Sequence, residues 1–331
     1  MKKILLTGGN GFIGHNLAIF LKNKGYEVAI IDGLNVNNLL SFTDDEIVNQ
    51  GLYRSILNER INLLNLNKIS LHVVDARDYH QYSKIFSSFS PDIVIHLAAV
   101  SHANKSNKDP HSTFDHSLRT LENTLDLCRV NKTHVIYLSS SMVYGNFTKG
   151  IVNEETECKP IGIYGTLKYS GELIVKAYNQ VFDLPYTIIR PSALYGERCV
   201  SRRVGQIFIE NLVNNKEIAI NGDGEDQLDF TYIEDFIDGI EKCCINPNAI
   251  NQTLNLTYGS SRPIIDLIKI LENNFDNIKV VKKPREAFMP ERGTLDVTKA
   301  KNLINFQPQN PIEIGYQKYI SWYKEFFNKL S

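Results

Sequence analysis

Short apolar runs alternate with helical patterns through the first 190 residues of the chain. Apolar runs between polar or glycine-rich segments predict buried strands, and apolar residues at helical spacing predict helices packed on a core. Strands are expected at 4–6, 26–31, 71–74, 93–97, 135–138 and 186–189. Helices are expected between them, after residue 14 and at 52–65, 82–89, 114–130 and 164–182. This alternation predicts an α/β fold built on a doubly wound parallel sheet.

The pattern changes after residue 190, where shorter elements follow one another without regular alternation. We expect strands at 218–220, 230–233, 254–256 and 279–281, and helices at 205–214, 234–244, 264–275 and 316–329. Residues 1–190 are therefore predicted to form one domain. Residues 191–331 would form a smaller mixed α/β domain, with parts of 229–257 returning to the first. The long connection at 33–69, helical at 44–50 and 52–65, either covers a substrate or only packs.

The first predicted strand runs into a glycine-rich turn. Four glycines fall within seven residues and fit both G-x-G-x-x-G and G-x-x-G-x-x-G; they are Gly8, Gly9, Gly11 and Gly14. Without side chains the backbone can approach a pyrophosphate closely, and the following helix supplies N–H donors and a partial positive charge. A strand, a glycine turn and a helix in this order therefore predict a dinucleotide-binding site.

An aspartate closes the second predicted strand and narrows the choice of dinucleotide. Asp32 lies 18 residues after Gly14, where a carboxylate can accept hydrogen bonds from the hydroxyls of an adenosine ribose. The same charge would repel a 2′-phosphate, and the residues that follow at 33–35 include no arginine to offset it. The expected cofactor is therefore NAD rather than NADP.

Hydroxyl groups follow the fifth predicted strand, and a tyrosine–lysine pair opens the next helix. Three serines at 139–141 stand at the carboxyl end of the strand, which is where open α/β sheets carry their active sites. Tyr164 and Lys168 are four residues apart and share one helix face. A nearby ammonium group lowers the pKa of a phenol and makes it a usable general base. These residues predict a proton-transfer site.

Composition argues against several other classes of protein. The 331 residues carry a net charge of −1, so there is no basic surface for nucleic acid or anionic lipid. No apolar run approaches the ~20 residues of a membrane span. The eight histidines show no metal-ligand spacing, and the five cysteines form no C-x-x-C pair. Because no signal-peptide pattern is present, we expect a cytoplasmic protein with free thiols and no metal.

Taken together, the motifs resemble a known family. TGGNGFIG, Asp32, SSSMVYG, YGTLK, IRPSALYG and GDGEDQLDFTYIED occur in the order found in extended short-chain dehydrogenase/reductases that act on nucleotide sugars. These are UDP-glucose 4-epimerase and its epimerase, dehydratase and decarboxylase relatives. The resemblance implies a Rossmann sheet that binds NAD and a smaller domain that binds a nucleotide-diphosphate sugar. It also implies a homodimer formed through helices 114–130 and 164–182.

The resemblance assigns roles to individual residues. Tyr164 would be the base, Lys168 would bind the nicotinamide ribose, and Ser140 would hydrogen-bond the reacting sugar hydroxyl. The other expected cofactor contacts are Gly8, Gly11, Phe12 and Ile13 at the pyrophosphate, Asp32 at the ribose, Asp75 and Ala76 at the adenine, Leu97, Ala98 and Ala99 beside the cofactor, and Pro191 by the nicotinamide. Positions expected to face the substrate are Ser101, Ser140, Ser141, Met142, Arg202, Arg203 and Arg292.

Departures from the family pattern bear on the reaction and the substrate. The 4,6-dehydratases carry an Asp-Glu pair where this chain has Ser141 and Met142, neither of which can protonate a leaving hydroxyl. Dehydration is therefore disfavoured, and so is decarboxylation that uses a glutamate at this place. Two family residues that contact the nucleotide diphosphate are replaced by Ala193 and Leu228, and a helix asparagine is replaced by His116.

Other cations would then have to hold the diphosphate. Arg292 matches a phosphate-binding position of the family, whereas Arg198, Arg202 and Arg203 are unmatched candidates that could equally be solvated loop charges. The preferred hypothesis is an NAD-dependent nucleotide-sugar epimerase that acts at C4 through a transient keto sugar. The alternatives are a net oxidoreductase, such as a keto-sugar reductase or sugar dehydrogenase, and a protein that binds NAD without catalysis.

Overall fold

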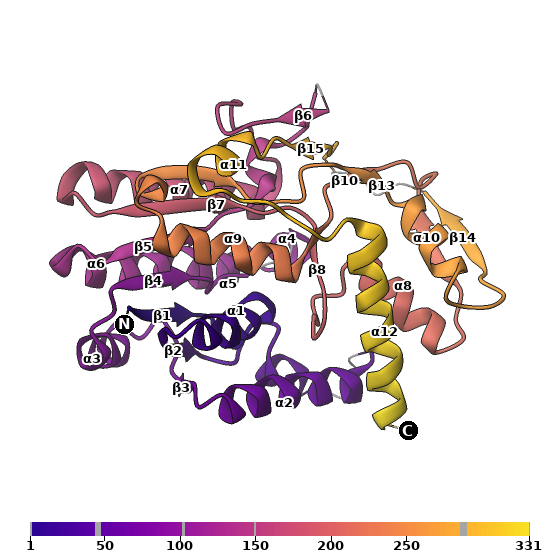
Figure 1. The fold of residues 1–331 in the computed structure, drawn as a ribbon, viewed down its shortest axis with the longest axis horizontal. Helices are drawn as coiled ribbons and strands as arrows, with labels where there is room; N and C mark the ends of the chain where they lie inside the picture. Colours follow the sequence, from indigo (N-terminus) through magenta and orange to yellow (C-terminus); the bar gives the residue numbers. More distant parts are fainter. Residues whose placement is uncertain (1, 44–47, 101–102, 149, 285–289, 331) are drawn as a thin grey trace.

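Seven parallel strands form the central sheet of the computed structural model, which describes residues 2–43, 48–100, 103–148, 150–284 and 290–330 (Figure 1). Their order is β3-β2-β1-β4-β5-β7-β12. The bounds are β1 Lys3–Thr7, β2 Glu27–Asp32, β3 Ser70–Val73, β4 Ile93–His96, β5 His134–Leu138, β7 Tyr186–Arg190 and β12 Gln252–Asn255. The order reverses between β1 and β4, which confirms the predicted doubly wound parallel sheet.

Helices cover both faces of the sheet, because successive side chains of a buried strand point to opposite sides. In β1, Ile4 and Leu6 enter one apolar core and Leu5 enters the other. The first core also contains residues of α1 (Phe12–Asn23), α2 (Gln50–Leu66) and α9 (Ile233–Ile245). The second contains residues of α3 (Tyr79–Phe89), α6 (Thr120–Asn131) and α7 (Gly162–Phe182).

Two elements that follow residue 190 complete the sheet and its first face. Strand β12 pairs in parallel with β7, with Leu254 beside Ile189. Helix α9 packs on α1, and the hydroxyl of Tyr26 donates to the Glu241 carboxylate at 2.8 Å. The segment from α9 to β12 therefore lies against the first 190 residues in space.

The remaining elements lie mostly beside and above the sheet in the view of Figure 1. The helices are α8 (Val204–Val213), α10 (Ile265–Glu272), α11 (Thr298–Ile304) and α12 (Ile312–Leu330). The paired strands are β6 (Ile151–Val152) with β15 (Thr294–Leu295), β8 (Leu194–Tyr195) with β11 (Thr231–Tyr232), β9 (Ile218–Asn221) with β14 (Val280–Lys283), and β10 (Gln227–Leu228) with β13 (Arg262–Pro263). Helix α12 packs against both α8 and α10.

The helix expected at 114–130 begins earlier and is not uniform. It starts with α5 (Pro110–Phe114), passes through a π-helical turn at Asp115–Arg119 and continues as α6. The early start has a local cause, because Pro110 suits the first helical position and the Asp109 carboxylate accepts from the Ser112 N–H at 3.0 Å. A further short helix, α4 (Ala103–Lys108), precedes it.

The helical prediction at 44–50 cannot be followed along its whole length, because 44–47 lie outside the described residues. Helix α2 begins at Gln50, after Asn49 in the left-handed region. No helix in the described part of the chain combines the length and the apolar character needed to cross a membrane.

Candidate functional site

Two adjoining cavities lie at the carboxyl ends of the central strands. The first is lined by all ten positions expected at the pyrophosphate, ribose and adenine or beside the cofactor: Gly8, Gly11, Phe12, Ile13, Asp32, Asp75, Ala76, Leu97, Ala98 and Ala99. The second, of about 610 Å³, is lined by Ser140, Ser141, Met142, Tyr164, Lys168, Pro191, Arg202, Arg203 and Arg292. This volume suits a small-molecule ligand. Five residues line both cavities: Ile13, Leu97, Ala99, Leu194 and Arg203. Ser101 lies outside the described residues.

The glycine turn has the geometry that a dinucleotide requires. Gly8 has φ +69°, and a Cβ there would stand 2.8 Å from the Ala98 backbone. A Cβ on Gly14 would stand 2.5 Å from the Cα of Gly9, so α1 can approach the turn only without that side chain. Gly11 precedes α1, and no side chain caps this helix terminus. The first N–H groups of α1 are therefore available to a pyrophosphate, and the residues fit the expected cofactor.

Asp32 presents a buried carboxylate to the first cavity. Its two oxygens accept hydrogen bonds from the Asn10 N–H at 2.9 Å and the Leu34 N–H at 2.7 Å. Burial raises the pKa of Asp32, while these bonds and the nearby Arg60 guanidinium oppose the rise. Each carboxylate oxygen has further lone pairs, so the group can still accept hydrogen bonds from ribose hydroxyls.

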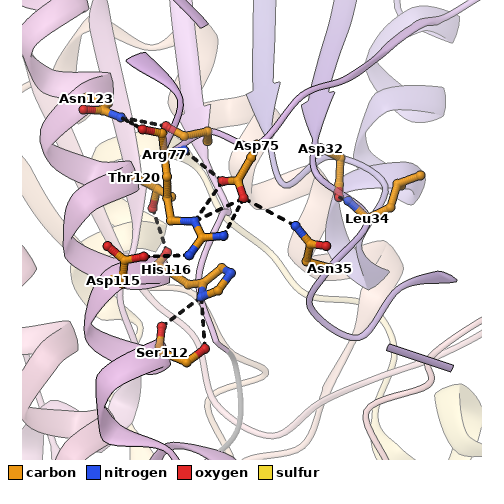
Figure 2. A network of polar contacts seen from close by, with 11 residues as sticks. Asp32, Leu34, Asn35, Asp75, Arg77, Ser112, Asp115, His116, Thr120 and Asn123 are labelled. Atoms are coloured by element: carbon orange, nitrogen blue, oxygen red, sulfur yellow. Dashed lines mark hydrogen bonds and ion pairs between the residues drawn. The ribbon is translucent and has the colours of Figure 1, made fainter. Parts of the chain in front are cut away.

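An ion-pair network lies at Asp75, where the sequence predicts the adenine end of the first cavity (Figure 2). The Arg77 guanidinium bonds both oxygens of Asp75 and also reaches Asp115 at 2.6 Å. Burial raises the pKa of Asp75, but its bonds to Arg77 outweigh that effect and hold the pKa below its ordinary value. His116 uses its Nδ1 on the Ser112 carbonyl at 2.9 Å, and its buried Nε2 meets no hydrogen-bond partner among the described residues. The sequence analysis missed Arg77, although it stands only two residues after Asp75.

The serine at the end of β5 and the tyrosine of α7 meet in the second cavity. Ser140 begins a short 3-10 turn, Ser141–Tyr144, and its Oγ accepts from the Met142 N–H at 3.1 Å. The side chain of Ser140 also opposes the rise in the pKa of Tyr164 that burial causes. The strand end and the helix start therefore bring two hydroxyl groups to the second cavity.

The expected effect of Lys168 on the tyrosine is wrong for the protein alone. Burial raises the pKa of Tyr164, and the groups that oppose this rise are Arg203, Ser140 and Arg292. The Lys168 ammonium instead donates to the Leu138 carbonyl at 2.6 Å. Burial lowers the pKa of Lys168 to about 8. Helical spacing placed the two side chains on one face, but it could not show how deeply each is buried.

A buried ion pair lies behind the lysine. The Arg190 guanidinium bonds the two carboxylate oxygens of Glu172 at 2.9 and 2.7 Å, and the Ser139 hydroxyl donates to the same carboxylate. Negative charge on Glu172 opposes the lowering of the Lys168 pKa. The sequence analysis missed Glu172, yet it follows Lys168 by four residues and so continues the same helix face.

Two arginines make contacts within the protein. Arg292, which lines the second cavity, contacts Ser141, Met142 and Ser192. Arg198 does not line the second cavity, because its Nε donates to Nε2 of the buried His15 at 3.2 Å.

A third arginine, which the sequence analysis did not single out, lies in the first cavity. Arg60 of α2 is 1 % exposed, and it donates to the Asn10 carbonyl at 3.2 Å and to the Arg198 carbonyl at 3.1 Å. It therefore ties the glycine turn to the loop before α8. Across the described part of the chain, no three His, Cys, Asp or Glu side chains gather to hold a metal ion.

Comparison with known proteins agrees with this geometry. Residues 4–256 match the family described as "NAD dependent epimerase/dehydratase family". The chain is 28 % identical to protein CapI of Staphylococcus aureus, over 99 % of this chain and 100 % of the relative. It is 29 % identical to a putative UDP-glucose 4-epimerase of Methanocaldococcus jannaschii, over 97 % and 98 %. The crystal structure of UDP-glucuronic acid 4-epimerase from Bacillus cereus, with UDP-glucuronic acid and NAD, is 27 % identical over 98 % and 99 %, with a TM-score of 0.87.

Proposed function

The chain belongs to the NAD-dependent epimerase/dehydratase family, and from this premise we propose that it is a nucleotide-sugar epimerase that inverts C4 through a transient keto sugar. NAD, when bound, supplies the group that accepts a hydride from the sugar and returns it. The observation that carries the proposal is the meeting of Ser140 and Tyr164 in a cavity that adjoins the cofactor cavity.

The chain's own residues account for the proton transfer. The Tyr164 oxygen takes the proton of the C4 hydroxyl, and Ser140 holds that hydroxyl in place by a hydrogen bond. Positive charge on Arg203 and Arg292 favours the phenolate, because both act against the rise in the Tyr164 pKa. Lys168, next to the strand end, is the group we assign to the nicotinamide ribose.

A redox-neutral reaction is supported by the two segments that line the cofactor cavity. Besides the glycine turn, the residues after β7 line it, namely Leu194, Val200, Ser201 and Arg203. Arg60 ties the glycine turn to this second segment. A cofactor held by both segments is suited to remain bound through many turnovers, as an epimerase requires and a net oxidoreductase does not.

The residues beside the base argue against loss of water from the sugar. Ser141 and Met142 offer no carboxyl group to protonate a leaving hydroxyl, and the Arg292 guanidinium occupies the space beside them. A guanidinium is charged at all physiological pH values and is a poor proton donor. The site therefore favours proton and hydride transfer at one carbon.

We assign the diphosphate to the start of α8. Arg203 directly precedes this helix, Arg202 lies next to it, and both line the second cavity. No side chain caps the α8 N-terminus, so its N–H groups and partial positive charge add to the two guanidinium groups. These groups replace the contacts that Ala193 and Leu228 cannot make.

The proposal is tested by releasing and assaying the cofactor and by one substitution. Denatured protein should release NAD, and the native enzyme should interconvert C4 epimers in a panel of UDP-, GDP-, CDP- and dTDP-hexoses without net NADH. Tyr164→Phe should lower kcat by ~10²- to 10⁴-fold and keep the bound NAD, because it removes only the proton acceptor. Tyr169→Phe on the same helix is the control. Unchanged turnover in Tyr164→Phe would refute the assignment of the base.

A further inference from the structure

We propose that Gln206 is a positioning residue, which holds Arg202 at the second cavity and is itself held by the buried carboxylate of Glu210. This inference rests on the proposed function, which assigns Arg202 to the diphosphate, and it adds the residues that fix the place of that arginine. It starts from a series of hydrogen bonds at α8, which runs from the Glu210 carboxylate through the Gln206 amide to the Arg202 backbone.

Arg202 stands in a backbone conformation that few side chains adopt. Its φ is +52°, in the left-handed region. Its N–H donates to Oε1 of Gln206, four residues further along, at 2.9 Å. Arg202 lines the second cavity, and its guanidinium makes no hydrogen bond or ion pair with any of the described residues. The backbone is therefore held in place while the cation stays available to an anionic ligand.

The Gln206 side chain uses both ends of its amide inside the protein. Its Oε1 accepts from Arg202, and its Nε2 donates to Oε1 of Glu210 at 2.7 Å. These partners fix the orientation of the amide, because exchanging its oxygen and nitrogen would set a donor against an N–H and an acceptor against a carboxylate. Gln206 borders the second cavity but is only 2 % exposed. Its contacts therefore suit a support for Arg202 rather than a ligand contact of its own.

Glu210 gives the series a fixed end. Three further donors reach its carboxylate: the Tyr53 hydroxyl at 2.7 Å, the Asn49 amide at 3.0 Å and the Tyr323 hydroxyl at 2.8 Å. They belong to α2, to the residue before α2 and to α12. The carboxylate is 2 % exposed, so turning it away would leave buried donors unpaired at a high cost. The Gln206 amide is therefore anchored to the packing of three helices.

The glutamine also leaves the start of α8 open. Arg203 is the N-cap of this helix, and Gln206 is its third residue. A glutamine at this position can bond the N–H of the N-cap, but Gln206 bonds the N–H one residue earlier. The series therefore fixes the entry of the chain into α8 without occupying the first N–H groups of the helix, which the proposed function gives to the diphosphate.

Binding of UDP to the NAD-saturated protein, measured by calorimetry, tests this role in a double-mutant cycle. Arg202→Gln removes the cation and should weaken UDP binding about 10-fold or more, as expected for a hydrogen bond to a charged group. Gln206→Met keeps the bulk of the side chain and removes both hydrogen bonds, so it should weaken UDP binding about fivefold. In the double variant, Gln206→Met should add less than about twofold, because it acts only through Arg202.

Two further sets of variants separate positioning from a loss of stability. Ile209→Val loosens the same buried helix outside the series, so it should lower the Tm and leave the Kd for UDP unchanged. Glu210→Gln keeps an acceptor for the Gln206 amide and should bind UDP within about twofold of the wild type, whereas Glu210→Leu should weaken binding about fivefold. This pair tests the series even if Gln206→Met does not fold.

The outcomes distinguish this proposal from the proposed function. An equal effect of Gln206→Met with and without Arg202, or equal binding by the two Glu210 variants, would overturn the positioning role and leave the diphosphate assignment standing. If Arg202→Gln binds UDP as the wild type does, or the wild type binds no UDP, the positioning role and the assignment of Arg202 both fail. C4 epimerisation is decided separately, by Tyr164→Phe.

Discussion

Burial changes the pKa values of individual residues at this site in ways that their spacing along the chain does not predict. Tyr164 and Lys168 share one face of α7, yet burial shifts the pKa of the phenol upward and that of the ammonium downward. Both shifts disfavour the charged forms, as expected when groups leave water. The charges that oppose the shift of Tyr164 come from Arg203 and Arg292, both distant in sequence.

The lowered pKa of Lys168 predicts how activity depends on pH. Its ordinary value of 10.5 falls to about 8, so the group is charged below that pH and neutral above it. If the charge supports catalysis, kcat/KM should fall as pH rises through about 8. In Lys168→Arg this fall in kcat/KM should begin at higher pH, because a guanidinium stays charged. The maximum rate of this variant should be lower than that of the wild type.

The measurement is kcat/KM between roughly pH 6 and pH 10 for both enzymes. NAD content is checked first, so that cofactor loss is not mistaken for loss of charge. If kcat/KM falls at the same pH in the wild type and in Lys168→Arg, the fall is caused by the titration of another group.

Among the elements, α2 answers the question that the sequence left open for residues 33–69. Its Tyr53 hydroxyl donates to the Glu210 carboxylate of α8 at 2.7 Å, and Tyr323 of α12 donates to the same group at 2.8 Å. Arg60 of α2 reaches the glycine turn. The connection therefore helps to line the first cavity and packs on α8, which lines the second. Glu210 is buried where α2, α8 and α12 meet.

This arrangement predicts that α2 helps to retain NAD. Arg60→Met keeps the apolar stem and removes the hydrogen bonds to the Asn10 and Arg198 carbonyls, so the loop before α8 should separate more easily from the glycine turn. We expect NAD to dissociate about tenfold faster, which corresponds to the loss of one or two net hydrogen bonds.

Dissociation is followed by the fluorescence of bound NADH after dilution into excess NAD. Arg54→Met, on an exposed position of the same helix, is the control and should match the wild type. Equal rates in all three proteins would contradict a role of α2 in retention.

For the whole molecule, we propose a homodimer formed through α6 and α7. Large apolar side chains on these helices are exposed to solvent, including Val130 at 74 %, Leu173 at 51 % and Val181 at 71 %. Exposed apolar groups gathered on neighbouring helices are typical of interaction surfaces, and α6 and α7 pack side by side.

Leu173→Glu should therefore shift the protein from twice the chain mass of 37.7 kDa to the single mass, because a buried unpaired charge is costly at an interface. Light scattering after gel filtration measures this mass directly. Ile314→Glu on α12 introduces the same charge at a similar exposure, 50 %, and should remain dimeric. A monomeric wild type, or the same behaviour in both variants, would reject this interface.

The sequence alone determined the features that depend on neighbouring residues. Alternating apolar runs and helical spacing specified the doubly wound sheet, because each element's period is local. The glycine spacing specified the dinucleotide turn, since Gly8 and Gly14 lie within a few residues of the strand and helix that they join. Asp32 and the pair Tyr164 and Lys168 were likewise found by their distance from these elements.

Only the tertiary structure decided which distant groups act on the site. Arg292 meets Ser141 across 151 residues, and Arg60 meets the Arg198 carbonyl across 138, distances over which no local period carries information. Burial of Tyr164 and Lys168 depends on everything packed around α7, so their pKa values could not follow from spacing. The helix and strand pattern thus decides where the cofactor lies, whereas long-range packing decides which charges face the sugar.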